Sequence, residues 1–242
     1  MNSGYVNLTI DGQVVQAQPG LTLLLAAREQ GIDIPTLCHH DDLKPEGHCR
    51  LCVVEIGEPG RTRLVNSCTY PAEPGLTVQT ASEKVLKARR MVLELLLAQA
   101  PAAEIIQKLA AEHGVYETRF KKADPQARCI LCGQCVRSCR EVVGVSAISM
   151  AFRTPKKVVA TPFKEESAAC IGCGSCVFIC PTNVIPYTEK DGIRTVWGRH
   201  FELQPCKVCG NYIAPKAQLE HWAKITGDPL ESFFVCRDCR QK

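Results

Sequence analysis

The sequence has 242 residues, a formal net charge of +4 and 16 cysteines, and this length allows one large domain or two to three small ones. The charge sum treats cysteine as neutral, whereas a site of four metal-bound thiolates carries a net charge of about −2. Four such sites would bring the loaded protein to about −4. The mild basicity therefore gives no reason to expect a nucleic-acid partner.

The sequence also lacks the signals of export and of membrane insertion. No basic segment followed by an apolar run stands at its start, so we expect no signal peptide. The longest apolar stretch, from about Met91 to Ala103, is interrupted by Glu94, Gln99 and Pro101, so we expect no membrane span. Because the cysteines are grouped and reduced thiols persist only in a reducing compartment, we expect a cytoplasmic protein.

Residues 1–80 are predicted to form a β-grasp domain. Apolar residues alternate from Val6 to Ile10, and Asp11-Gly12 is typical of a hairpin whose two turn residues need positive φ. A helix is expected over Leu21 to Gln30, ending at Gly31. Further strands are expected at Cys52–Ile56, Arg63–Asn66 and Leu76–Thr80.

Four cysteines of this first domain have the spacing C-x10-C-x2-C-x15-C: Cys38, Cys49, Cys52 and Cys68. Three ligands in one loop and a distant fourth indicate a [2Fe–2S] cluster, although the plant-type spacing is C-x4-C-x2-C. Gly47 would let the loop bend beside the sulfurs. A structural zinc ion held by the four thiolates is the alternative.

Residues 81–124 are predicted to form a helical linker. Ser82 is a candidate N-cap, and Pro101 separates the first apolar stripe from a second helix that ends near Gly114. The pair is interpreted as a packing spacer between the flanking domains.

Residues 125–199 contain the same cysteine motif twice, C-x2-C-x2-C-x3-C, offset from 129 to 170. This is the spacing of bacterial two-cluster ferredoxins, in which the fourth cysteine of each motif binds the other cluster. The prediction is two crossed [4Fe–4S] ligand sets. The first, cluster A, has Cys129, Cys132, Cys135 and Cys180, and the second, cluster B, has Cys170, Cys173, Cys176 and Cys139.

Residues 200–242 form a tail with two further C-x2-C pairs separated by 26 residues: Cys206, Cys209, Cys236 and Cys239. The pattern predicts a small zinc-ribbon-like metal site, although the separation exceeds the usual range. A further iron–sulfur cluster and a mononuclear iron site are the alternatives. The aromatic residues Trp197, Trp222, Phe233 and Phe234 are expected in the core of this tail, with a recognition surface as the alternative.

Two segments carry a family resemblance, from Gly47 to Glu55 and from Cys129 to Val142. They resemble the large iron–sulfur subunit of respiratory NADH dehydrogenase, in its N-terminal region, and the diaphorase iron–sulfur subunit of NAD-linked bidirectional hydrogenases. The N-terminal part of iron-only hydrogenases is also similar, and the likeness covers about residues 4–187. It implies a [2Fe–2S] cluster on the first cysteine set and [4Fe–4S] clusters on the two later sets.

The sequence departs from that family at one cluster and at its tail. The family usually places a site of one histidine and three cysteines after the first helix of the linker. Here no cysteine stands between Cys68 and Cys129, so that cluster is expected to be missing. The four-cysteine tail is an addition to the family pattern.

These features together predict an α+β protein that transfers electrons and has no catalytic residues of its own. No G-x-G-x-x-G loop and no P-loop occur in the sequence. The resemblance implies a soluble multi-subunit oxidoreductase in which this subunit relays single electrons between a flavin- and NAD(H)-binding subunit and a further dehydrogenase or hydrogenase subunit. A free ferredoxin-like carrier and a zinc-only interaction or regulatory protein are the alternatives.

Overall fold

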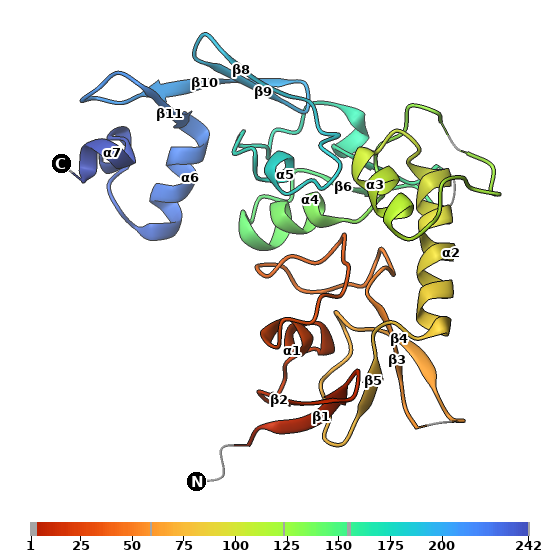
Figure 1. Cartoon of the computed structure of the whole chain (residues 1–242). Helices are drawn as coiled ribbons and strands as arrows, with labels where there is room; N and C mark the ends of the chain where they lie inside the picture. Colours follow the sequence, from red (N-terminus) through yellow and green to blue (C-terminus); the bar gives the residue numbers. More distant parts are fainter. Residues whose placement is uncertain (1–3, 59, 123, 154–155, 242) are drawn as a thin grey trace. The chain divides into compact units, whose positions relative to one another are not determined.

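The computed structural model describes residues 4–58, 60–122, 124–153 and 156–241 (Figure 1). The chain divides into two compact units, Met1–Cys132 and Gly133–Lys242. Among the described residues, no helix is both long enough and apolar enough to cross a membrane.

The first unit is built around a five-stranded mixed sheet with the order β2-β1-β5-β3-β4. β1 and β5 are parallel, and the other neighbouring pairs are antiparallel. Helix α1 follows the first hairpin, so the predicted succession of strands and helix is confirmed. The elements are β1 (Val6–Ile10), β2 (Gln13–Ala17), α1 (Leu23–Glu29), β3 (Val53–Ile56), β4 (Arg63–Asn66) and β5 (Thr77–Gln79).

The hairpin between β1 and β2 shows why this sheet forms where the sequence predicts it. Asp11 and Gly12 have φ values of 50° and 81°, the backbone that a two-residue hairpin turn requires. The alternating Leu8 and Ile10 of β1 are at most 2% exposed and pack in the core of the sheet with α1. The Asp11 carboxylate also accepts a hydrogen bond from the Thr80 backbone N–H at 2.8 Å, which fixes the end of β5.

Two helices follow the sheet, α2 (Glu83–Gln99) and α3 (Glu104–Glu112). The Ser82 hydroxyl accepts from the Val85 backbone N–H at 3.3 Å, so the predicted N-cap is confirmed. Leu93 of α2 and Ile106 of α3 are fully buried in one core with Leu51 of the cysteine loop. The helices therefore support the loop that carries the first cysteine set.

The second unit contains the second cysteine motif and the part of the first motif that follows Gly133, each with a short helix. Gly133 and Gly174 have φ values of 77° and 75° and precede α4 and α5 at equivalent points of the repeat. Only a residue that tolerates positive φ fits these positions well, which explains glycine in both. The elements of this part are α4 (Gln134–Arg137), the π-helix η1 (Ser138–Val142), β6 (Ser149–Ala151), β7 (Val158–Ala160), the 3-10 helix η3 (Pro162–Lys164) and α5 (Ser175–Phe178).

A four-stranded antiparallel sheet with the order β11-β10-β9-β8 follows the second motif. One of its strands, β10, includes both residue 199 and residue 200, where the sequence predicted the boundary between the ferredoxin-like domain and the tail. The hairpins of this sheet join the motif to the C-terminal segment within one fold. The elements are β8 (Tyr187–Lys190), β9 (Ile193–Val196), β10 (Arg199–Pro205), β11 (Tyr212–Pro215), α6 (Lys216–Thr226), the 3-10 helix η4 (Leu230–Phe234) and α7 (Arg237–Arg240).

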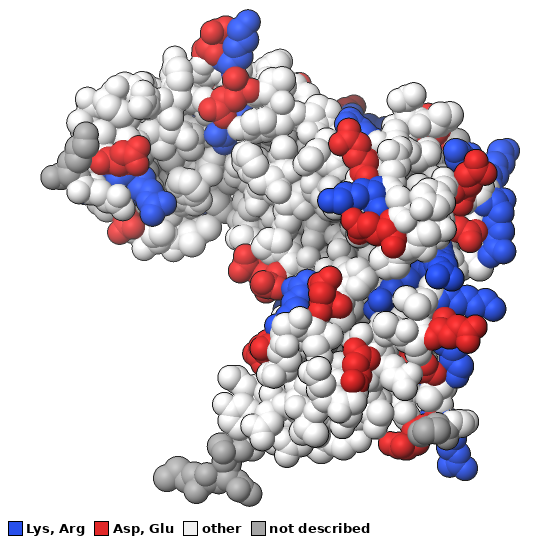
Figure 2. All heavy atoms as spheres, in the orientation of Figure 1, with Lys and Arg blue, Asp and Glu red and all other residues white. Residues whose placement is uncertain are grey.

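Charged side chains of both signs are interleaved on the face drawn in Figure 2, and no broad single-sign patch is visible there. On this face, the distribution differs from the basic stripe that proteins use to bind a nucleic-acid backbone.

Candidate metal centres

The first cysteine set lies in the first unit, in the loop before β3 and in the segment after β4. Cys38, Cys52 and Cys68 are at most 2% exposed and Cys49 is 7% exposed. The loop bends at Gly47, whose φ is 64°, and a Cβ added there would stand 3.2 Å from the Asn66 side chain. Glycine at position 47 therefore lets the loop lie close to the segment that carries the fourth cysteine.

The four sulfurs of this set form two neighbouring pairs, Cys38 with Cys49 and Cys52 with Cys68. Hydrogen bonding from Cys38 lowers the pKa of Cys49 to about 6, and hydrogen bonding from Cys68 lowers the pKa of Cys52 to about 7. The pKa of each partner thiol is raised, first by that hydrogen bond and then by burial. A [2Fe–2S] cluster has two thiolate ligands on each iron, so two adjacent pairs fit it in donor type and in grouping.

A buried arginine of α2 holds the chain on both sides of Cys52. Arg89 is 5% exposed and donates hydrogen bonds to the Leu51 carbonyl at 3.3 Å and to the Val53 carbonyl at 2.9 Å. Burial lowers the pKa of Arg89, and the nearby Cys52 thiolate opposes that effect. The guanidinium therefore brings a positive charge close to a predicted cluster ligand.

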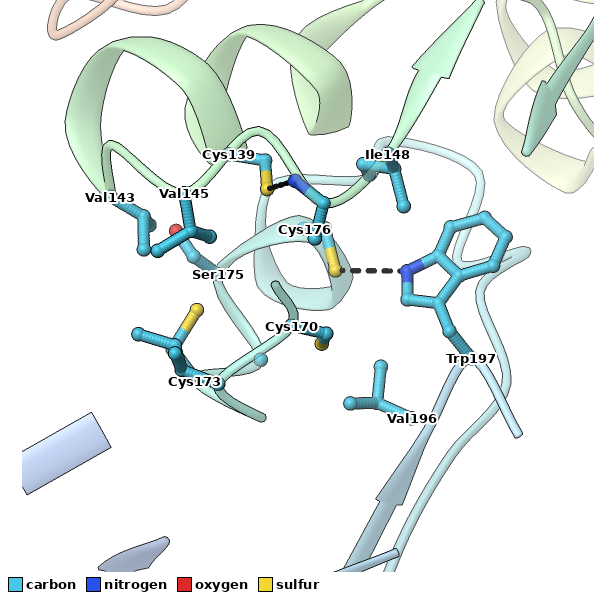
Figure 3. A pocket seen from close by; sticks show the side chains of 13 residues that line it. Cys139, Val143, Val145, Ile148, Cys170, Cys173, Ser175, Cys176, Val196 and Trp197 are labelled. Carbon is cyan, nitrogen blue, oxygen red and sulfur yellow. Dashed lines mark hydrogen bonds between the residues drawn. The ribbon is translucent and has the colours of Figure 1, made fainter. Parts of the chain in front are cut away.

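The second unit brings all four cysteines predicted for cluster B to one apolar pocket (Figure 3). Cys139 comes from the first motif, and the other three come from the second motif. The rest of the lining includes Val143, Val145, Ile148 and Val196.

Burial in this pocket raises the pKa of Cys176 to about 11, and it also raises the pKa values of Cys170 and Cys173. Such thiols stay protonated unless a cation stabilises their thiolates, and iron does so by direct coordination. Four sulfur donors around an apolar space therefore fit an iron–sulfur cluster and offer no site for a hydrophilic substrate.

N–H groups from outside the second motif donate to two sulfurs of this pocket. The Ala147 backbone N–H donates to Cys139 Sγ at 3.2 Å, and Trp197 Nε1–H donates to Cys176 Sγ at 3.4 Å (Figure 3). The expectation that both tryptophans lie in the core of the tail was wrong. The Trp197 side chain faces the cysteine pocket, and Trp222 is 40% exposed.

The ligand set predicted for cluster A belongs half to each unit. Cys129 and Cys132 end the first unit, whereas Cys135 and Cys180 belong to the second. This set stays a prediction from the motif.

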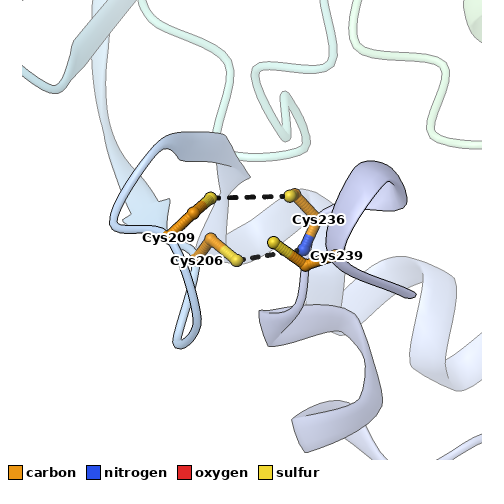
Figure 4. Close-up of side chains that lie close together, drawn as sticks. All are labelled: Cys206, Cys209, Cys236 and Cys239. Atoms are coloured by element: carbon orange, nitrogen blue, oxygen red, sulfur yellow. Dashed lines mark hydrogen bonds between the residues drawn. The ribbon is translucent and has the colours of Figure 1, made fainter. Parts of the chain in front are cut away.

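The four cysteines of the tail lie close together, with their sulfurs facing one another (Figure 4). Their four Sγ atoms lie within 4.8 Å of one another, and Cys209 Sγ is 3.7 Å from Cys236 Sγ. Among the residues that the structure describes, this is the one group of three or more such donors gathered closely enough for a single metal ion. Metal–sulfur bonds of about 2.3 Å in a tetrahedron separate the sulfurs by about 3.8 Å, close to this spacing.

Backbone donors surround one tail sulfur. Cys206 Sγ accepts from the N–H groups of Val208 at 3.4 Å and Cys236 at 3.3 Å. Backbone hydrogen bonds lower the pKa of Cys206 to about 6, that from Cys236 the most, then those from Cys209 and Val208. Cys206 and Cys209 lie in the loop between β10 and β11, while Cys236 and Cys239 lie at α7, so folding joins the two pairs.

Two family profiles match the chain. Residues 3–83 match a 2Fe-2S iron-sulfur cluster binding domain, and residues 128–185 match a 4Fe-4S dicluster domain. A chain in the crystal structure of an NAD+-reducing [NiFe]-hydrogenase in the H2-reduced state is 34% identical, with a TM-score of 0.57. The similarity covers 64% of this chain and 74% of that chain.

This chain belongs to the family of iron–sulfur subunits of NAD(P)-linked oxidoreductases and hydrogenases.

Two further relatives are much longer than this chain. An NADH-quinone oxidoreductase subunit of Rhizobium meliloti is 34% identical over 215 residues, which cover 76% of this chain and 25% of that protein. NADP-reducing hydrogenase subunit HndD of Solidesulfovibrio fructosivorans is 34% identical over 210 residues, covering 74% of this chain and 36% of that protein. The chain thus spans about a quarter to a third of these two relatives.

Two residues of this family member escaped prediction because their roles depend on tertiary contacts. Arg89 is on the helix after the first domain, 37 positions beyond Cys52, and Trp197 is 21 positions beyond Cys176. One sequence signal pointed to Trp197: a Trp-Gly pair stands between two strands, where Asn-Gly is the favoured pair.

Proposed function

We propose that this chain is the electron-transfer subunit of a cytoplasmic, multi-subunit NAD(P)-linked dehydrogenase or hydrogenase. It would relay single electrons between a flavin-containing subunit and a second redox centre, and catalyse no reaction itself. The observation that supports this most directly is the apolar pocket with four cysteine sulfurs in the second unit. The same chain also has a domain of the [2Fe–2S] type. Two kinds of iron–sulfur centre in one chain are suited to passing electrons from one centre to the next.

In this proposal the centres occupy the predicted domains. A [2Fe–2S] cluster would be held in residues 1–80 by Cys38, Cys49, Cys52 and Cys68. Within residues 125–199, cluster A would be held by Cys129, Cys132, Cys135 and Cys180, and cluster B by Cys139, Cys170, Cys173 and Cys176. Residues 81–124 would support the cysteine loop of the first domain. When bound, each cluster supplies a one-electron acceptor, and the surrounding burial and N–H donors set its potential.

The tail of residues 200–242 would hold one Zn²⁺ through Cys206, Cys209, Cys236 and Cys239, in a zinc-ribbon-like site. The mutual sulfur spacing within 4.8 Å favours a single ion, because a cubane holds its cysteine sulfurs farther apart than one tetrahedral ion does. Four thiolates complete a tetrahedral shell and leave no open position for substrate. The site would therefore stabilise the tail.

The names of the relatives support the choice of partners. They include components of an NADH-quinone oxidoreductase and of an NADP-reducing hydrogenase. A flavin-containing subunit that binds NAD(H) or NADP(H) would exchange electrons with one end of the chain of clusters, and a dehydrogenase or hydrogenase subunit with the other.

Anaerobic purification from the native source is expected to yield an assembly well above 26.6 kDa that contains flavin. NADH or NADPH should then reduce its iron–sulfur clusters within the mixing time of a stopped-flow experiment, because the flavin divides a hydride into single electrons. The measurement is native mass together with cluster absorbance after mixing. A lone species of 26.6 kDa, with clusters reduced by dithionite but by neither nucleotide, would favour a free carrier.

A further inference from the structure

Trp197 occupies a backbone position that an aromatic residue rarely adopts. The β9–β10 hairpin pairs Val196 with Arg199, so Trp197 and Gly198 are its two turn residues. Their φ values are 53° and 79°, as a type I′ turn requires. Asparagine and glycine are favoured there, and a bulky side chain at positive φ is an outlier that costs about 1 kcal/mol or more. Strained backbone positions cluster at functional sites, so this one marks Trp197 as a candidate for a functional role.

The strained position places the indole at the cysteine pocket. Trp197 Nε1–H donates to Cys176 Sγ at 3.4 Å (Figure 3). The indole also packs against the apolar residues around the four cysteines of cluster B. Trp197 therefore donates a hydrogen bond directly to a predicted ligand of that cluster.

The same hairpin is fixed to the cysteine loop by two arginines. Arg199 Nη1 donates to the carbonyls of Ser167, Ala168 and Cys170 at 2.9, 3.0 and 2.8 Å. Arg194 Nη1 donates to the Gly172 carbonyl at 2.9 Å. These hydrogen bonds fix the β9–β10 turn against the loop of the second cysteine motif. The position of the indole is therefore determined by the fold.

The Phe201 ring lies against the same loop. A Cβ added to Gly172 would stand 2.6 Å from that ring, so the ring and the loop backbone are in close contact. The hairpin thus covers the cysteine loop through side chains of both β9 and β10.

We propose that Trp197 is a positioning and tuning residue that raises the reduction potential of the cluster held by Cys139, Cys170, Cys173 and Cys176. When the cluster gains one electron, negative charge on its sulfurs increases and the N–H···S hydrogen bond becomes stronger. No covalent bond forms or breaks, and the electron comes from dithionite in the test below. The inference rests on the proposed function, because it needs a cluster in this pocket.

The test is a redox titration with dithionite as the reductant, followed by EPR on the anaerobic full-length protein, with wild type compared with Trp197→Phe. The variant keeps an aromatic ring and removes the donor. One [4Fe–4S] centre should titrate at a lower potential, while the other [4Fe–4S] centre and the [2Fe–2S] centre keep theirs. Trp222→Phe is the matched control, because Trp222 is exposed and packs against Phe233 in the tail.

A second variant separates the lost donor from any loss of packing. The chain has two tryptophans, so in a Trp222→Phe background a tryptophan analogue enters at position 197 alone. Benzothienylalanine has sulfur in place of the indole N–H and nearly the same shape. It should lower the same potential with unchanged iron content. An unchanged potential in this protein, or an equal shift in Trp222→Phe, would overturn the inference. Wild-type protein without [4Fe–4S] signals would overturn the proposed function as well.

Discussion

Replacing Cys139 with alanine is expected to remove the cluster of the second cysteine motif, although Cys139 belongs to the first motif. The structure places its sulfur at the pocket shared with Cys170, Cys173 and Cys176. The Ala147 N–H donates to that sulfur at 3.2 Å, which holds the side chain at the pocket. Three thiolates do not complete the ligand set of the cubane, so we expect the whole cluster to be lost, about four of roughly ten irons per chain.

Double variants show which cluster is lost in Cys139→Ala. Crossed ligation predicts that Cys139→Ala and Cys173→Ala act on the same cluster, so their combination loses no more iron than either alone. Cys139→Ala combined with Cys132→Ala should lose both [4Fe–4S] clusters. Iron analysis and EPR spin quantification on anaerobic protein provide the measurement. The reverse pattern, additive loss with Cys173→Ala and no further loss with Cys132→Ala, would show uncrossed ligation.

Replacing Arg89 with methionine is expected to destabilise the [2Fe–2S] site selectively. Arg89 is buried and donates to the carbonyls of Leu51 and Val53, on either side of Cys52. Methionine has a similar length but no donor, so both carbonyls would lose a charged partner. Hydrogen bonds to charged groups contribute about 1.5–3 kcal/mol each, so we expect a loss of about 3 kcal/mol in local stability. The positive charge near Cys52, which favours the bound thiolate, is lost as well.

The rate at which a ferrous chelator bleaches the [2Fe–2S] EPR signal measures this effect. Arg90→Met is the control on the next residue, because Arg90 is exposed and donates instead to the His113 carbonyl at 3.2 Å. The Arg89 variant should lose the signal at least ten times faster than wild type, with the [4Fe–4S] signals retained. Equal rates in the Arg89 and Arg90 variants would show that the guanidinium does not hold the loop.

The elements that the sequence predicted correctly are those determined by residues close to one another in the sequence. The Asp11-Gly12 turn, the alternation in β1 and the cap at Ser82 each depend on neighbouring residues, and each is present in the structure. The cysteine motifs are similarly local, because three thiols within seven residues leave few folds that can use them.

The features that escaped prediction depend on contacts between distant segments. The positions of Arg89 and Trp197 at cysteine loops follow from how α2 and the β9–β10 hairpin pack. Composition suggested that Trp222 would be buried, yet it is 40% exposed beside Phe233, which shows that an aromatic residue alone does not locate a core. In the tail, the 26-residue separation looked long for one metal site, but β11 and α6 occupy it and return the chain to the first pair.

Electron transfer by this chain requires that the first three cysteine sets bind iron and inorganic sulfide. Analysis of anaerobically purified protein for iron, acid-labile sulfide and zinc tests this most directly. We predict about ten irons and about ten sulfides per chain, from one [2Fe–2S] and two [4Fe–4S] clusters, with about one zinc that has no sulfide partner. Colourless protein that contains zinc but no acid-labile sulfide would contradict the account.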